Sequence, residues 1–192
     1  MENNNKQKFL EICQLIKREG IDKLIAYLEK SDFYTAPASS KFHSNFEGGL
    51  CEHSLKVYAR FKQNVANEFP TGEISEETIA IVALFHDICK INYYKPDTRN
   101  IKIDGVWVQR PYYSVEDTLP YGHGEKSAYI LSGFLRLSRD EAMAINWHMG
   151  AFDDRIKGGN FQLSNVFNNY KLAFVFHVSD IEATYLDEKI IN

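Results

Sequence analysis

Long apolar runs and paired cysteines are both missing from this chain of 192 residues. The longest purely apolar stretch, Ile79 to Phe85, is far too short to span a bilayer. The first residues, MENNNKQK, lack the apolar core of a secretory signal, so we expect none. The three cysteines, Cys13, Cys51 and Cys89, form neither a CxxC pair nor a disulfide framework. These absences favour a cytoplasmic protein with free thiols and no membrane association.

An excess of positive charge is also missing. The chain has 22 basic and 26 acidic residues, which gives a formal charge of −4. This balance argues against a dedicated nucleic-acid coat or a membrane-surface protein, but a local basic patch could still hold a nucleotide or nucleic acid. There is no internal repeat and no low-complexity linker. The length predicts a single domain, residues 1–192, that is able to bury a hydrophobic core.

Apolar residues recur at helical spacing along most of the chain and predict an all-α bundle of about six or seven helices. The helix that Ser75 would cap is apolar nearly all round, so it belongs in the middle of the bundle and would bury His86 and Asp87. Residues 33–49 and the glycine- and asparagine-rich segment after Gly150 are predicted loops. The expected helices are residues 9–16, 21–28, 50–67, 76–91, 124–137, 139–148 and 171–188.

The helical period is interrupted once. Residues 101–108 alternate apolar and polar side chains around Asp104-Gly105, a dipeptide that favours a type I′ turn. We therefore predict a small β-hairpin insert at about residues 99–115.

Four histidines and two aspartates form the most informative pattern. Any one of them alone is more often a hydrogen-bonded core residue, and adjacent His86-Asp87 could be such a pair. Together, however, they exceed what one tetrahedral site uses and suit two metals that share a carboxylate. Facing helices are a usual place for such a centre. The candidates are His53 in GGLCEHS, His86-Asp87 in LFHDICK, His123 in YGHGEKS, His148 in NWHMG and Asp180 in HVSDIEATYLDE.

The order and local sequence of these motifs resemble the HD-domain superfamily of metal-dependent phosphohydrolases. The matching stretches, GGLCEHSLKVY, ALFHDICK, YGHGEKSAYIL, NWHMG and HVSDIEATY, span roughly residues 41–188. GGLxEHS and HGEKSA are especially similar to the HD domain of 3′→5′ exoribonucleases. The resemblance implies that Asp87 bridges two divalent metals. It implies one metal on His53, His86, Asp87 and Asp180, and a second on His123 and His148.

The resemblance also implies an activity. It points to a phosphomonoesterase or phosphodiesterase that acts on a nucleotide or a nucleic-acid 3′ end through a metal-activated hydroxide. The HDxxK pattern implies that Lys90 contacts phosphate beside the catalytic Asp87, although a salt bridge to Asp87 would also explain this lysine. Manganese, iron, cobalt, nickel, zinc and magnesium all remain open, as does the oligomeric state. Two alternatives remain: an HD-domain di-iron oxygenase with the same ligands, and a non-catalytic metal-binding interaction module.

Several other residues are candidates for binding substrate. Lys126, three residues after His123, could touch phosphate or be solvated. His43 could orient the substrate or lie on the surface. His177 is expected in the core, hydrogen-bonded to a ligand carboxylate.

The hairpin insert interleaves aromatic and basic residues, a composition that can stack a base and grip a phosphate. Arg110 is the basic residue we expect to bind substrate. The alternative is that the large side chains of the insert pack the hairpin onto the bundle. The aromatic residues in question are Trp107, Tyr112, Tyr113 and Tyr121.

Overall fold

A computed structural model describes residues 2–41 and 44–188 of the chain. This part is mostly helical, with nine α-helices and one two-stranded antiparallel hairpin, as the sequence predicted. The helix count exceeds the prediction because α7 and α8 lie in a segment expected to be a loop. The helices are α1 Glu2–Cys13, α2 Ile21–Glu29, α3 Gly49–Glu68, α4 Glu76–Phe85, α5 His123–Ser132, α6 Arg139–Asn146, α7 Asp154–Lys157, α8 Gln162–Asn169 and α9 Lys171–Glu182.

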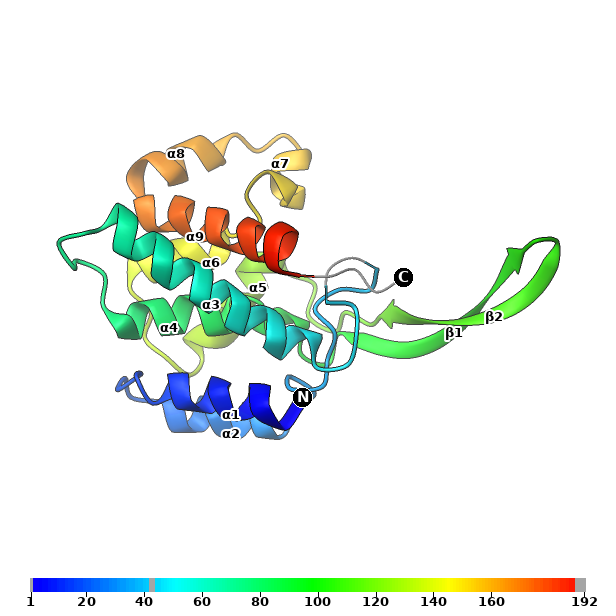
Figure 1. Cartoon of the computed structure of the whole chain (residues 1–192). Helices are drawn as coiled ribbons and strands as arrows, with labels where there is room; N and C mark the ends of the chain where they lie inside the picture. Colours follow the sequence, from blue (N-terminus) through cyan, green and yellow to red (C-terminus); the bar gives the residue numbers. More distant parts are fainter. Residues whose placement is uncertain (1, 42–43, 189–192) are drawn as a thin grey trace.

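Helix α4 forms the centre of the bundle. It contacts α3, α6 and α1, while α9 packs across α3 and α6 (Figure 1). Every residue from Ile79 to Phe85 is buried, so the prediction of a central helix is confirmed. The Ser75 hydroxyl caps this helix by accepting a hydrogen bond from the Thr78 amide at 3.1 Å, as expected.

The prediction that this helix continues to Ile91 is wrong. Helix α4 ends at Phe85, and the chain turns at Asp87, whose backbone angles are φ −103° and ψ 17°. A single 3-10 turn, η1 Ile88–Lys90, follows. An uninterrupted apolar pattern gave no sign of this break. In a continuous helix the side chains of consecutive residues point about 100° apart. Because the helix breaks here, the side chains of His86 and Asp87 can both face His53.

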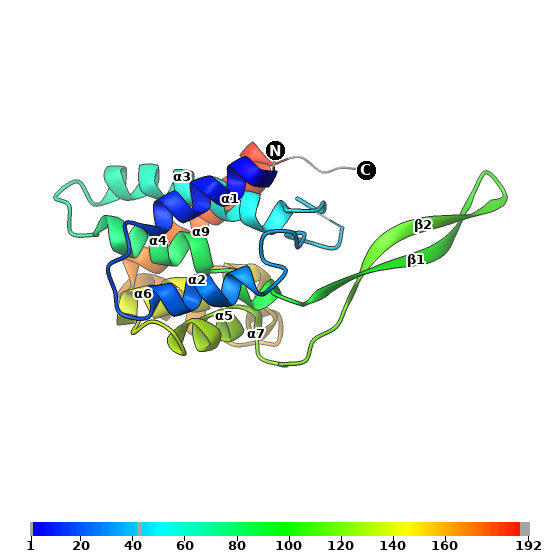
Figure 2. The same ribbon diagram turned by 90° about the horizontal axis from the view of Figure 1, so that it is seen from below.

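The predicted hairpin is present and longer than expected. Strands β1 Tyr94–Ile103 and β2 Val106–Val115 pair along their whole length and begin five residues before the expected boundary. Asp104 and Gly105 have φ values of 49° and 86°, which confirms the predicted type I′ turn. Figures 1 and 2 show this hairpin projecting away from the helices.

The C-terminal half shows both agreement and correction. The predicted capping box between Ser138 and Glu141 starts α6, but α6 ends at Asn146. Gly150 has φ 52°, and a Cβ there would lie 2.2 Å from the His177 ring, so this glycine lets the chain pass close to α9. Helix α9 ends at Glu182 and continues as a π-helical turn, η3 Ala183–Asp187, instead of an α-helix to residue 188.

No helix in the described part of the chain is long and apolar enough to cross a bilayer. The three cysteines are buried and unpaired by disulfides. Both observations agree with the expectations from the sequence. Burial raises the pKa of Cys13 and Cys51 to about 12, so these two thiols stay protonated at neutral pH.

A partly buried ion pair joins the N-terminal segment to α6. Arg18 donates to both oxygens of Glu141, at 2.6 and 3.0 Å, and Glu141 is fully buried. Burial raises the pKa of Glu141, but hydrogen bonds from Arg18, the Ser138 amide and Thr78 outweigh it and lower the pKa below its ordinary value of 4.5. The Glu141 carboxylate is therefore held in its charged form.

Replacing Glu141 with alanine should lower the free energy of unfolding by about 2–3 kcal/mol, because Arg18 would keep a partly buried charge without this partner. That corresponds to a fall in Tm of roughly 5–10 °C. The depressed pKa makes this contribution full above pH 4.5, and the contribution is lost as the pH falls through the folded-state pKa. Thermal melts from pH 3 to 8 would test this. Glu77→Ala, which removes a more exposed partner of Arg18, should cost about 1 kcal/mol or less. Equal costs for both variants would contradict the prediction.

Candidate metal centre

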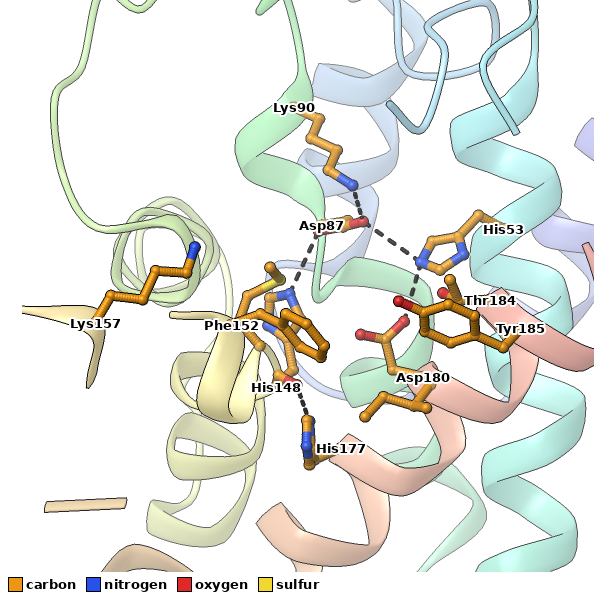
Figure 3. A pocket seen from close by; sticks show the side chains of 12 residues that line it. His53, Asp87, Lys90, His148, Phe152, Lys157, His177, Asp180, Thr184 and Tyr185 are labelled. Atoms are coloured by element: carbon orange, nitrogen blue, oxygen red, sulfur yellow. Dashed lines mark hydrogen bonds and ion pairs between the residues drawn. The ribbon is translucent and has the colours of Figure 1, made fainter. Parts of the chain in front are cut away.

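The six predicted ligands converge on one place, around Asp87. They come from five segments that are far apart in the sequence and are brought together by the packing of α3, α4, α5, α6 and α9. Figure 3 shows four of them, His53, Asp87, His148 and Asp180. Most of them lie at helix ends, where the chain can turn a side chain inward. His53 lies on α3, His86 and Asp87 directly follow α4, His123 is the first residue of α5, His148 follows α6, and Asp180 lies on α9.

One group of ligands faces the Oδ2 oxygen of Asp87. The Nε2 atoms of His53 and His86 are 3.1 Å apart, and each is 3.5 Å from Asp87 Oδ2. Asp180 Oδ1 lies 3.3 Å from His53 Nε2 and 3.9 Å from His86 Nε2. Four polar atoms from three segments of the chain thus lie close together.

A second group faces the other oxygen of the same carboxylate. His123 Nε2 lies 2.8 Å from Asp87 Oδ1, and His148 Nε2 lies 3.5 Å from it. The two oxygens of Asp87 are therefore directed to different sets of imidazoles. This is the arrangement expected of a carboxylate that bridges two cations.

Two of the imidazoles are fixed so that their Nε2 atoms face the cluster. Nδ1 of His86 is 2.9 Å from the Ala83 carbonyl, and Nδ1 of His148 is 2.7 Å from the Ile145 carbonyl. A carbonyl only accepts hydrogen bonds, so both Nδ1 atoms donate, and Nε2 is the nitrogen of each ring that is left to face the cluster. Nε2 of His148 is buried without a hydrogen-bond partner among the described residues. A buried orphan nitrogen of this kind suits a metal ligand.

The His53 imidazole is also oriented through its outer nitrogen. His53 Nδ1 lies 2.6 Å from Glu188 Oε1, and Ser44 donates to Oε2 of the same carboxylate at 2.6 Å. The Cys89 sulfur lies 3.5 Å from His123 Nδ1 and 3.7 Å from its Nε2, and Cys89, Asp87 and His123 form a group of residues that could hold a metal ion. The sequence gave no signal for Glu188, which is 135 residues from His53. Cys89 was interpreted only as a small apolar residue.

These residues could hold divalent metal ions. Imidazole Nε2 atoms and carboxylate oxygens point at shared positions, where acceptors would repel one another unless a proton or a metal ion lay between them. Asp87, Asp180 and Glu188 contribute three largely buried negative charges, against the Lys90 ammonium 2.6 Å from Asp87. A surplus of buried negative charge favours cation binding.

The pKa values show the same demand for positive charge. Burial lowers the pKa of His53, but the carboxylates of Asp180 and Glu188 outweigh it and raise the pKa to about 9. Burial likewise opposes protonation of His123, yet Cys89 and Asp87 raise its pKa to about 10. Burial lowers the pKa of His86 to about 3, so this ring is neutral. Metal ions at these positions would displace the protons on His53 and His123.

A cavity of about 510 Å³ opens onto the centre, within the size range of small-molecule sites. Its walls are mainly apolar, and Figure 3 shows Phe152 and Tyr185 on opposite sides of it. Phe152, Lys157 and Tyr185 were not predicted from the sequence, because nothing in their local pattern marks them as lining a cavity. Phe152 and Tyr185 lie in the irregular turns η2, Gly150–Phe152, and η3, whereas Lys157 is the last residue of the short helix α7.

The remaining candidates fall in different places. Lys90 lines the cavity and donates a hydrogen bond to Asp87. Lys126 is buried, paired with Asp117, and lines an adjoining hollow of about 360 Å³ that includes His123. Arg110 lies on β2, in a separate hollow that contains none of the predicted ligands. His43 lies outside the described residues.

His177 lines the cavity but is not bonded to a ligand carboxylate, so that part of its prediction is wrong. Its Nδ1 donates instead to the backbone carbonyl of His148 at 2.5 Å. The ring stacks on Phe167, with centroids 5.6 Å apart. His177 therefore supports the chain that carries His148.

Neither protein-family models, nor curated proteins, nor solved structures give a match to this chain. Function is therefore inferred from the geometry of the centre and from the motifs that build it.

Proposed function

We propose that this protein is a metal-dependent phosphohydrolase with a binuclear centre bridged by Asp87. The observation that carries the proposal is the division of the Asp87 carboxylate, with one oxygen facing His53 and His86 and the other facing His123. When bound, two divalent cations lower the pKa of a water and act as Lewis acids towards a phosphate ester. The resemblance of the ligand motifs to HD-domain phosphohydrolases supports the same reaction class.

The ligands divide between two positions. His53, His86 and Asp180 would hold one cation and His123 and His148 the other, with Asp87 shared. The Nδ1 contacts of His53, His86 and His148 keep the coordinating nitrogens directed inward before a metal arrives. This preorganisation lowers the cost of assembling the centre.

Lys90 would contact the substrate phosphate. Its ammonium is nearly buried, and it lines the cavity while bonded to Asp87 Oδ2 at 2.6 Å. Burial lowers the pKa of Lys90, but the adjacent Asp87 carboxylate outweighs it and holds the pKa above its usual range. Lys90 therefore stays cationic and can donate to a phosphate oxygen once metals occupy the carboxylate.

The cavity favours an ester that carries an apolar or aromatic group. Phe152 and Tyr185 are about half and two-thirds exposed, at 52% and 69%, so both present free ring surface to an incoming ligand. Flat aromatic walls suit a nucleobase. A nucleotide or the terminal nucleotide of a strand is the substrate class that we propose.

The test is metal content together with hydrolysis. Protein purified without chelator should contain close to two metal atoms per chain by elemental analysis. It should hydrolyse nucleotide or bis-p-nitrophenyl phosphate esters with or without O₂, lose this activity in EDTA, and regain it with Mn²⁺ or another divalent ion.

Other outcomes would refute the proposal in distinct ways. Turnover that consumes O₂ and requires iron would identify an oxygenase built on the same ligands. Two metal atoms without turnover on any phosphate ester would leave a metal-binding module. At most one atom after reconstitution would rule out the binuclear centre.

A further inference from the structure

The β1–β2 hairpin extends beyond the helical bundle as an arm. Its two ten-residue strands pack on each other, and most of their side chains are exposed. Figures 1 and 2 show the arm reaching well away from the helices. Isolated two-stranded hairpins are marginally stable in water. An arm of roughly 30 Å whose side chains are mostly exposed indicates an interaction surface.

The charge of the arm is opposite to that of the body. Residues 94–115 contain four basic and two acidic residues, a formal charge of +2, in a chain whose total is −4. The rest of the chain therefore carries −6. A basic extension on an acidic body points to an anionic partner.

Two of the four cations of the arm line one hollow of about 480 Å³ at its root. Arg99 and Arg110 are direct cross-strand partners, an arrangement in which like charges repel. Lys41 lines the same hollow from the loop that precedes α3. Within residues 2–41 and 44–188, none of these three side chains forms an ion pair with a carboxylate. A bound anion would relieve this repulsion.

Aromatic side chains accompany these cations along the arm. Tyr112 and Tyr113 line the root hollow, and the Arg99 guanidinium lies 5.3 Å from the centre of the Tyr112 ring. Near the tip, Lys102 lies 6.0 Å from the Trp107 ring, and Trp107 is 67% exposed. Cations interleaved with aromatic rings are recognition elements for a single-stranded nucleic acid.

We propose that the arm and its root hollow bind single-stranded nucleic acid, leaving one end of the strand in the metal cavity. The backbone phosphates would lie on Lys41, Arg99 and Arg110, and bases would stack on Tyr112 and Trp107. The root hollow and the metal cavity share no lining residue, so an occupant of both must extend from one to the other, as a strand does. Placing one end of the nucleic acid in the metal cavity rests on the proposed function. The proposed binding of nucleic acid to the arm does not.

Two connections link the root of the arm to the metal centre. Strand β1 begins four residues after Lys90. The other wall of the hollow includes Asn45, and its neighbour Ser44 is bonded to Glu188, which in turn holds His53. A strand that leaves the cavity towards this side therefore meets the three cations next.

The alternative occupant, a second copy of the chain, would pair along the open edges of the arm. Pro96 and Pro111 lie in the two strands, near the root, and remove backbone donors that such pairing would use. The edges are thus poorly suited to strand addition, while the side chains suit an anion.

The test is binding of a fluorescein-labelled single-stranded RNA or DNA of about twelve nucleotides, measured by anisotropy in EDTA so that no hydrolysis can occur. We expect the double variant Arg99→Gln/Arg110→Gln to bind at least tenfold more weakly. We also expect its log–log salt dependence to fall by about 1.4, the value for two lost phosphate contacts on a single strand. The control Lys23→Gln/Arg139→Gln removes two exposed cations from the body and should leave affinity within twofold.

Intrinsic fluorescence gives a second measurement on the unaltered protein. The chain has two tryptophans, of which Trp147 is buried and Trp107 is exposed. Strand binding should quench the Trp107 emission, and Trp107→Phe should abolish the quenching while anisotropy still reports binding. An absence of quenching would overturn the stacking role of the arm.

Three further outcomes would overturn the proposal. If both double variants weakened nucleic-acid binding equally, binding would depend only on the overall charge of the protein. If a mononucleotide displaced the labelled nucleic acid as effectively as an unlabelled strand does, the root hollow would be a site for a small anion. A dimer in light scattering that the arm variants dissociate, without strand binding, would assign the arm to a second copy. Strand binding in EDTA by a protein that hydrolyses no ester with metals would refute the proposed function alone.

Discussion

Replacing Asp87 with asparagine is expected to remove the binuclear centre while the protein stays folded. The amide keeps the shape of the side chain but offers one acceptor oxygen in place of two. Its NH₂ group would face either the Lys90 ammonium, now 2.6 Å from Oδ2, or the His123 nitrogen, now 2.8 Å from Oδ1. Neither position could then hold a cation as before. We expect fewer than one metal atom per chain and hydrolysis slower by about a thousandfold or more, about 4 kcal/mol in activation free energy.

Asp153→Asn is the matched control for this variant. Asp153 is also a buried aspartate, but it is held by the Arg155 guanidinium at 2.8 Å and belongs to none of the His and Asp groups that could hold a metal. Its replacement should cost stability through the lost ion pair and leave the metal content at two. Retention of two metals in Asp87→Asn, measured by elemental analysis, would contradict the bridging role.

The sequence alone predicted the centre of the fold and the convergence of the ligands. The apolar run from Ile79 to Phe85 required a buried helix, and a buried His86-Asp87 pair required polar partners. Asp104-Gly105 required a tight hairpin turn, which the structure has. These predictions succeeded because each rests on a local pattern with one physical solution.

The parts that failed depend on tertiary packing. Nothing in an unbroken apolar stretch marks the end of α4 at Phe85, because the turn at Asp87 is compensated by contacts with other helices. Glu188 meets His53 only through the path of the chain after α9. Phe152 and Tyr185 belong to short irregular turns whose side-chain directions follow no period. Sequence patterns thus predict which side chains are available, and packing decides which of them meet.

His86 and His148 form a natural pair for testing whether there are two metal positions. Each follows the end of a helix, each is buried, and each donates from Nδ1 to the carbonyl three residues earlier. They differ in the oxygen of Asp87 that their Nε2 faces, Oδ2 for His86 and Oδ1 for His148. Alanine at either position therefore removes the same chemistry with a similar packing cost, from different sides of the carboxylate.

Each variant is expected to retain about one metal atom per chain and to lose about 100-fold or more in hydrolysis, because the two cations act on one phosphate. In Mn²⁺-loaded protein, electron paramagnetic resonance should show a spin-coupled pair in the wild type and isolated ions in both variants. His177→Ala is the control, since His177 lines the same cavity but belongs to none of the groups among the described residues that could hold a metal, and its Nδ1 donates to the His148 carbonyl. It should keep the coupled pair. Coupling that survives in His148→Ala would mean that Asp87 Oδ1 faces no second cation, and the centre would then be mononuclear or built on other residues.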